Sequence, residues 1–72
     1  MRVLVADDHP LYREAVARQI TRLLPDATVE EAASMEAALA SAEAVHPSLF
    51  VFDYYMPGMS AQAIARLAET YA

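Results

Sequence analysis

The sequence predicts an α/β fold in which helices connect the strands of a parallel sheet. Short apolar runs alternate with segments whose apolar residues recur at helical spacing, in the order strand, helix, strand, helix, strand, helix. The first and third runs are uninterrupted, which is typical of parallel strands covered on both faces. Both runs end in aspartate, so acidic side chains are expected at the carboxyl edge of the sheet, where open α/β folds bind ligands.

The first strand is expected over residues 2–6, and its Val-Leu-Val run suits the centre of the sheet. A helix is expected to begin near Pro10, because proline suits the first helical turn, with Asp8 or His9 near the N-cap. Residues 25–26, a Pro-Asp pair, end this helix. Its apolar face is expected to carry residues at helical spacing, namely Tyr12, Val16, Ile20 and one of Leu23 and Leu24.

The second strand is expected over residues 28–33, where two glutamates interrupt the apolar character. An exposed edge strand tolerates such residues, so this strand is placed at an edge of the sheet. Ser34 is expected to cap an alanine-rich helix that continues to about residue 45. A His-Pro pair then ends the helix.

The third strand is expected over residues 49–53, followed by a loop and a last helix. Gly58 is the only glycine of the chain, so a positive φ angle is expected there. Ser60 is the expected N-cap of the last helix. The apolar face of that helix is expected to comprise Ile64, Leu67, Ala68 and Tyr71.

Composition limits what the chain can be. The 72 residues suffice for one small domain, and the 57% hydrophobic fraction contains so much alanine that the core is expected to be thin. There is no cysteine, which excludes disulfides and thiolate metal sites. A net charge of −5 argues against nucleic-acid binding by this segment. With no signal-peptide pattern and no bilayer-length apolar stretch, we expect a cytoplasmic protein with no membrane contact.

Three carboxylates follow the two apolar strands: Asp7 and Asp8 follow the first, and Asp53 ends the third. If these strands are parallel neighbours, the three groups gather at one edge, where their repulsion raises at least one pKa unless a cation neutralises them. The pattern therefore predicts a divalent-metal pocket. An Asp-Asp pair near a helix start, taken alone, is ordinarily a solvated first turn stabilised by the helix dipole. The additional aspartate at the end of the third strand, Asp53, favours a shared metal site instead. His9 is expected to help set the turn rather than to bind a metal.

Two segments, residues 3–13 (VLVADDHPLYR) and residues 50–59 (FVFDYYMPGM), resemble a bacterial response-regulator receiver domain. The Asp-Asp-His-Pro start is similar to the LuxR/NarL/FixJ-type branch of that family. The resemblance implies a flavodoxin-like, doubly wound parallel sheet whose first three strands lie in the order 2-1-3. It extends over nearly the whole chain.

The same resemblance implies a function in two-component signalling rather than an enzymatic one. Asp53 would be the phosphoacceptor that receives a phosphoryl group from a sensor histidine kinase, with Mg²⁺ as cofactor. Asp8 and Asp53 would bind Mg²⁺ directly, Asp7 mostly through water, and Tyr55 through its backbone carbonyl. Magnesium suits such a site, because it prefers oxygen ligands and takes one or two carboxylates together with phosphate oxygens.

A complete receiver has five strands, so residues 1–72 are expected to be a partial receiver without strands and helices four and five. The family's phosphoryl-contacting hydroxyl and lysine residues lie in those elements. All basic residues of this chain are arginines. Switching is therefore expected to be impaired.

Two other functions stay open. An unpaired, apolar third strand would recruit another chain, so we expect a homodimer or oligomer that joins two third strands in a continuous sheet. The alternative function is accordingly a phosphorylation-independent interaction or dimerisation module. A small magnesium-dependent phosphohydrolase is least favoured, because no residue is placed to activate water.

Overall fold

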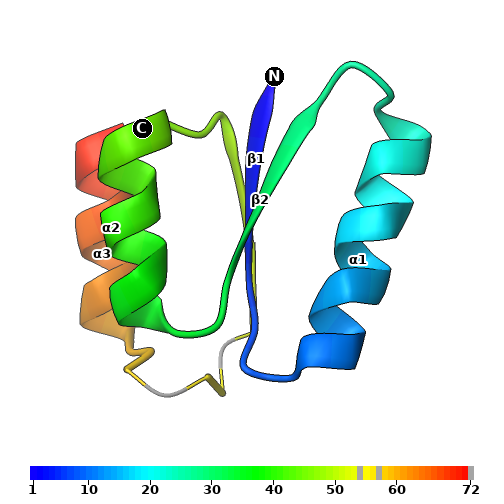
Figure 1. Cartoon of the computed structure of the whole chain (residues 1–72). Coiled ribbons are helices and arrows are strands. Elements are labelled where there is room, and N and C mark those ends of the chain that lie inside the picture. The colour runs from blue at the N-terminus through cyan, green and yellow to red at the C-terminus, as the bar shows by residue number, and fades with distance from the viewer. Residues whose placement is uncertain (54, 57, 72) are drawn as a thin grey trace.

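The computed structural model describes the backbone of residues 1–53, 55–56 and 58–71, and within these the side chains up to residue 68. The expectation for the Tyr71 side chain lies outside this part. Strands and helices alternate along the chain (Figure 1). They are β1 (Arg2–Ala6), α1 (Pro10–Leu23), β2 (Thr28–Ala32), α2 (Met35–Val45), β3 (Leu49–Phe52) and α3 (Ala61–Tyr71). The predicted order of elements is confirmed, with β2 and β3 each one residue shorter than expected.

The sheet has the predicted strand order β2-β1-β3, and both pairings are parallel. Val5 at the centre lies opposite Glu31 on β2 and opposite Val51 on β3. As the middle strand, β1 is almost wholly buried, and Val3 is fully inaccessible to solvent. The edge position of β2 explains why it accommodates two glutamates.

The three helices cover the two faces of the sheet unequally: α1 lies on one face, and α2 and α3 lie on the other (Figure 1). Side chains alternate between faces along a strand, so Leu4 and Ala6 point toward α2 and α3 and join the main core there. Small residues of α2, including the fully buried Ala42, allow that helix to approach the sheet closely. The other buried members of this core are Ala32, Met35, Ala38, Met56 and Leu67.

The predicted helix-boundary residues have the expected geometry. The Ser34 side-chain oxygen accepts a hydrogen bond from the Ala37 backbone N–H at 3.1 Å at the start of α2. The Ser60 side-chain oxygen accepts one from Ala63 at 3.0 Å at the start of α3. His46 ends α2 in the left-handed conformation, with a φ of 49°. Gly58 has the predicted positive φ, at 83°.

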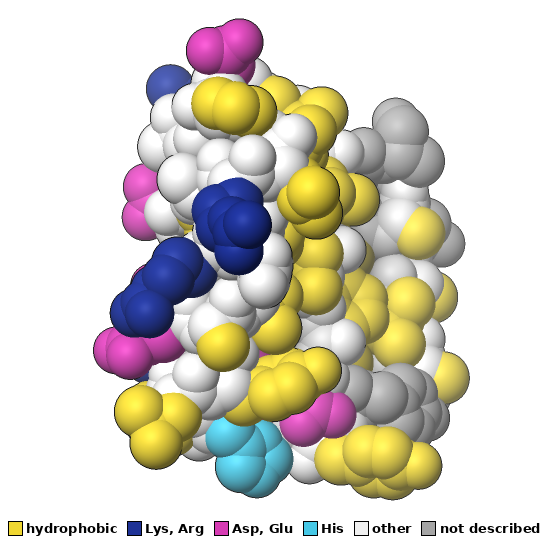
Figure 2. All heavy atoms as spheres, turned by 90° about the vertical axis from the view of Figure 1, so that its right-hand side faces the viewer, with side chains coloured by type: hydrophobic (Ala, Val, Ile, Leu, Met, Phe, Trp, Pro, Cys, Tyr) yellow, Lys and Arg dark blue, Asp and Glu magenta, His cyan; other side chains and the backbone are white. Residues whose placement is uncertain are grey.

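The apolar face expected for α1 is only partly buried, which corrects the sequence prediction. Val16 and Ile20 are half-buried, but Tyr12 is 64% exposed and Leu23 is 77% exposed. Ala17 is the buried residue of this helix. The reason is that no described helix covers the β3 side of this face. Figure 2 shows hydrophobic side chains gathered in a band on this side of the molecule.

None of the helices in the described part of the chain is long and apolar enough to cross a membrane.

Replacing Leu4 by alanine is expected to lower the free energy of unfolding by about 2–4 kcal/mol, because Leu4 is only 1% exposed and its removal leaves a cavity. The same change at Leu11, which is 83% exposed, is the matched control and is expected to cost less than about 0.5 kcal/mol. Urea unfolding followed by circular dichroism measures both. Equal losses in the two variants would contradict the described core.

Candidate metal centre at the carboxyl edge of the sheet

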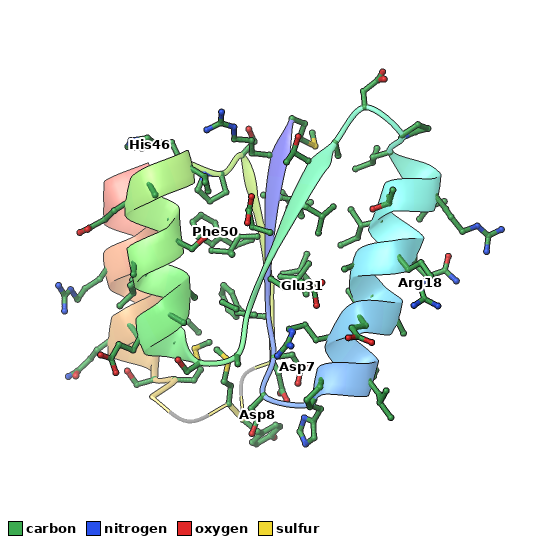
Figure 3. All side chains as sticks on the ribbon, in the orientation of Figure 1. Asp7, Asp8, Arg18, Glu31, His46 and Phe50 are labelled. Carbon is green, nitrogen blue, oxygen red and sulfur yellow. The ribbon has the colours of Figure 1, made fainter. Side chains whose placement is uncertain are left out.

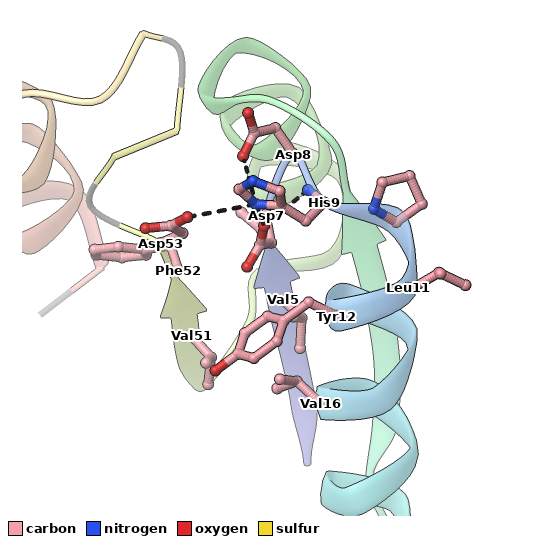
Figure 4. Close-up of a pocket in the computed structure, with 12 residues that line it drawn as sticks. Val5, Asp7, Asp8, His9, Leu11, Tyr12, Val16, Val51, Phe52 and Asp53 are labelled. Carbon is pink, nitrogen blue, oxygen red and sulfur yellow. Dashed lines mark hydrogen bonds and ion pairs between the residues drawn. The ribbon is translucent and has the colours of Figure 1, made fainter.

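Asp7, Asp8 and Asp53 meet at one edge because of the parallel pairing of β1 and β3. Asp7 and Asp8 directly follow β1, and Asp53 directly follows β3. One ligand atom from each of these carboxylates, and one from His9, all lie within 4.8 Å of one another. Figure 4 shows the four side chains converging from the ends of the two strands. The gathering anticipated from the sequence is therefore present in the structure.

The sheet itself fixes the backbone of this site. The Asp7 N–H donates to the Ala32 carbonyl on β2 at 3.0 Å, and the Asp53 N–H donates to the Ala6 carbonyl on β1 at 3.1 Å. Each bond continues the strand ladder one residue beyond the strand end. Asp7 is 5% exposed, whereas the Asp8 and Asp53 side chains are 33% and 25% exposed. The cluster thus has one buried acid and two that face solvent.

The His9 ring lies among the three carboxylates, a placement that the sequence prediction missed. Its Nδ1 is 2.9 Å from Asp7 Oδ1, 3.1 Å from Asp8 Oδ1 and 3.8 Å from Asp53 Oδ2. The His9 backbone N–H also donates to Asp7 Oδ1, at 2.8 Å, which forms the turn that leads into α1. His9 therefore helps to set the turn, as predicted, and its ring also contacts the three carboxylates. The sequence feature that could have predicted this contact is the position of Asp7 two residues before His9, directly ahead of the proline that begins α1.

Arg13 is a second residue whose role the sequence did not reveal. Its Nη1 donates to the Asp7 backbone carbonyl at 3.1 Å. Its Nε donates to Glu31 Oε1 on β2 at 3.0 Å, and its side chain is 17% exposed. Arg13 therefore links α1 to the end of β1 and to the edge strand. Nothing local in the sequence reports this contact, because Glu31 is distant along the chain.

Neighbouring positive groups favour the charged form of the Asp7 carboxylate. Burial raises the pKa of Asp7, but the hydrogen bonds from the His9 backbone and ring, with the charges of His9 and Arg13, outweigh burial and leave that pKa below its ordinary value. The hydrogen bond to Asp7, followed by the charge of Asp8, raises the pKa of His9. The repulsion expected from the sequence is thus relieved at Asp7 by neighbouring cations.

Tyr55 orients Asp53 through its backbone. The Tyr55 N–H donates to Asp53 Oδ1 at 3.0 Å, while Asp53 Oδ2 is the atom nearer His9. The Tyr55 side chain is 89% exposed. The role of its backbone carbonyl as a ligand stays a prediction.

An apolar groove of about 960 Å³ extends from the cluster between α1 and β3. Its walls include Tyr12 and Val16 from α1 and Val5 and Val51 from the sheet, with the aspartates at one end (Figure 4). The carboxylates therefore form the polar end of an otherwise hydrophobic surface.

The donor set fits a hard divalent cation. Carboxylate oxygens that converge at a partly exposed edge are the ligands that Mg²⁺ uses, together with water and phosphate oxygens. The Asp8 and Asp53 side chains are partly exposed, whereas Asp7 Oδ1 already accepts two hydrogen bonds from His9.

Comparisons with known proteins give matches over most of the chain. A family model described as the response regulator receiver domain matches residues 3–71. The "Probable transcriptional regulatory protein NarL" of Mycobacterium tuberculosis (strain ATCC 25618 / H37Rv) is 39% identical over 71 residues, which is 99% of this chain and 33% of that protein. The "Nitrate/nitrite response regulator protein NarL" of Escherichia coli (strain K12) is 41% identical over 59 residues, covering 81% of this chain and 27% of that one.

A solved structure of the signal receiver domain of NarL from Mycobacterium tuberculosis is similar with a TM-score of 0.81 and 42% identity. The similarity covers 96% of this chain and 56% of that domain structure. The chain thus spans about a third of the length of the curated relatives and about half of the solved receiver.

The His9 imidazole is expected to titrate above the ordinary value of 6.5 in the metal-free protein, because Asp7 and Asp8 favour its charged form. This pairing stabilises the fold below the ordinary histidine pKa, and the contribution is lost as pH rises through the raised pKa. An NMR titration of the ring protons measures the shift. In Asp7→Asn the His9 pKa should fall, and an unchanged pKa in that variant would contradict the described contact.

Proposed function

The chain belongs to the response regulator receiver family, and from this we propose that it accepts a phosphoryl group on Asp53 from a sensor histidine kinase, with Mg²⁺ as cofactor. The observation that supports this proposal best is the convergence of Asp7, Asp8 and Asp53 at one sheet edge. A receiver is a signalling domain, so phosphorylated Asp53 would be the signalling state of the domain rather than an intermediate of an enzymatic reaction.

In the proposed reaction a carboxylate oxygen of Asp53 attacks the phosphorus of a phosphohistidine. The phosphorus–nitrogen bond breaks, the donor imidazole leaves, and an acyl phosphate forms on Asp53. Asp53 Oδ1 accepts the Tyr55 N–H, so the carboxylate is held in one orientation while Oδ2 faces the cluster. Bound Mg²⁺ would supply the positive charge that offsets repulsion between the carboxylate and the incoming phosphoryl group.

Burial supports a division of labour among the metal ligands. We assign Asp8 and Asp53 as direct ligands, because both side chains are partly exposed. Asp7 is the most buried of the three and already accepts two hydrogen bonds from His9, which favours an indirect contact through water. The Tyr55 backbone carbonyl is proposed as the remaining protein ligand, since its N–H already brings that residue to Asp53.

Propagation of the signal is proposed to be weak in these 72 residues alone. All basic residues of the chain are arginines, so no lysine can pair with the phosphorylated Asp53 within this segment. The relatives are named as transcriptional and nitrate/nitrite regulators, and we propose the same broad context, two-component control of transcription, for the protein to which this segment belongs.

Incubation of the protein with Mg²⁺ and acetyl phosphate, followed by intact-mass measurement, is expected to give a single phosphate adduct. Asp53→Asn should abolish the adduct, because an amide oxygen is a far poorer nucleophile than a carboxylate. Asp26→Asn is the matched control, since Asp26 is exposed in the turn after α1, and it should retain the adduct. An adduct that persists in Asp53→Asn would refute the assigned acceptor.

A second candidate function is self-association through β3, as a phosphorylation-independent interaction module. Among the described residues β3 pairs only with β1, so its outer edge has no strand partner there. That edge carries the apolar sequence LFVF, and Leu49 is 41% exposed. Apolar strand edges of this kind recruit other chains. A two-fold pairing of β3 with β3 would give a sheet of order 2-1-3-3-1-2.

Light scattering after gel filtration is expected to give the mass of a dimer, and Leu49→Lys should shift the population toward monomer, because a charged side chain would then lie at the end of the strand edge that has to pair. Leu23→Lys, at the exposed end of α1, is the matched control and should remain dimeric. A monomeric mass for the unaltered chain would exclude this candidate.

A further inference from the structure

We infer that His9 is a nitrogen ligand of the cation site, and that it raises the affinity of this site for Co²⁺, Ni²⁺ or Zn²⁺ without any gain for Mg²⁺. The inference rests on the proposed metal site and adds a residue to it. It starts from the position of the His9 ring, whose Nδ1 lies nearest to the very oxygens that would surround an ion.

The distance between His9 Nδ1 and Asp8 Oδ1 matches that between adjacent ligands of one ion. Two adjacent ligands, each about 2.0–2.1 Å from a metal, lie about 3 Å apart when their bonds make roughly a right angle. Toward the two carboxylates proposed as direct ligands, His9 Nδ1 lies 3.1 Å from Asp8 Oδ1 and 3.8 Å from Asp53 Oδ2. A small displacement of the ring would therefore make room for an ion between Nδ1 and the carboxylates.

The ring is held toward the cluster but can move. The His9 backbone N–H is fixed to Asp7 Oδ1 at 2.8 Å, and Pro10 begins the helix immediately afterward. The side chain itself is 69% exposed and forms no capping hydrogen bond to α1. Among the described residues, the ring's ion pairs are with the three carboxylates, which an incoming ion would also contact.

Ligand chemistry then separates the metals. Imidazole nitrogen suits Co²⁺, Ni²⁺ and Zn²⁺, whereas Mg²⁺ prefers an all-oxygen octahedron and keeps several waters. For the first group His9 supplies an additional bond. For Mg²⁺ the ring only competes for the oxygens of Asp8 and Asp53, so it has to turn away. His9 is thus proposed to determine which class of metal the receiver edge takes.

The test compares Co²⁺ and Mg²⁺ binding by isothermal titration calorimetry at one fixed pH, with the visible absorption of Co²⁺ as a second readout of nitrogen ligation. His9→Phe keeps a planar ring without the nitrogen. We expect it to weaken Co²⁺ binding at least about tenfold and to change the Co²⁺ spectrum, while Mg²⁺ binding is unchanged or tighter.

His46→Asn is the matched control, because it removes the only other histidine of the chain from a left-handed position that asparagine tolerates. His46 lies at the end of the sheet opposite Asp7 and Asp8 (Figure 3), so this change should leave both affinities unaltered. The inference is overturned if His9→Phe leaves Co²⁺ binding intact, if it weakens both metals by the same factor, or if His46→Asn weakens Co²⁺ equally.

Asp8→Asn distinguishes failure of this inference from failure of the proposed function. Mg²⁺ binding that is lost in Asp8→Asn supports the metal site whatever His9 does. If Mg²⁺ binding depends on Asp8 but Co²⁺ binding does not depend on His9, only the inference falls. If Mg²⁺ binds equally well to Asp8→Asn, the proposed metal site falls and the inference falls with it.

Discussion

The repulsion among three carboxylates held at one sheet edge is the constraint on which the rest of this site depends. Parallel pairing of β1 with β3 brings Asp7, Asp8 and Asp53 together whether or not a cation is present. The chain relieves part of this repulsion itself, because His9 lies among the acids and Arg13 holds the Asp7 carbonyl. These contacts also fix the turn between β1 and α1. The same interactions therefore compensate the charge of the carboxylates and hold the local backbone structure.

The two faces of the sheet are covered unequally by helices, and this determines what surrounds the carboxylate edge. The main core lies between the sheet and the helices α2 and α3, where Leu4 and Met56 are buried. On the opposite face α1 leaves a hydrophobic groove beside β3, and the acids lie at its end. A buried central strand thus supports a site whose Asp8 and Asp53 side chains are partly exposed.

Local patterns were enough to predict the order of elements, the helix caps at Ser34 and Ser60, and the gathering of the aspartates. Each of these depends on neighbours in sequence or on the simple rule that adjacent parallel strands end at one edge. The contacts of His9 and Arg13 could not be predicted in this way. Both depend on where α1 lies against the sheet. The exposure of Tyr12 shows that the helical spacing of apolar residues was not enough to predict which face of α1 is buried.

The most direct measurement of the central claim, that this edge is a single divalent-cation site, is an anomalous difference map from crystals of the protein grown with Mn²⁺. The account predicts one peak within bonding distance of carboxylate oxygens of both Asp8 and Asp53, with Asp7 behind it. Full occupancy of Mn²⁺ elsewhere on the protein, with no peak between Asp8 and Asp53, would contradict it.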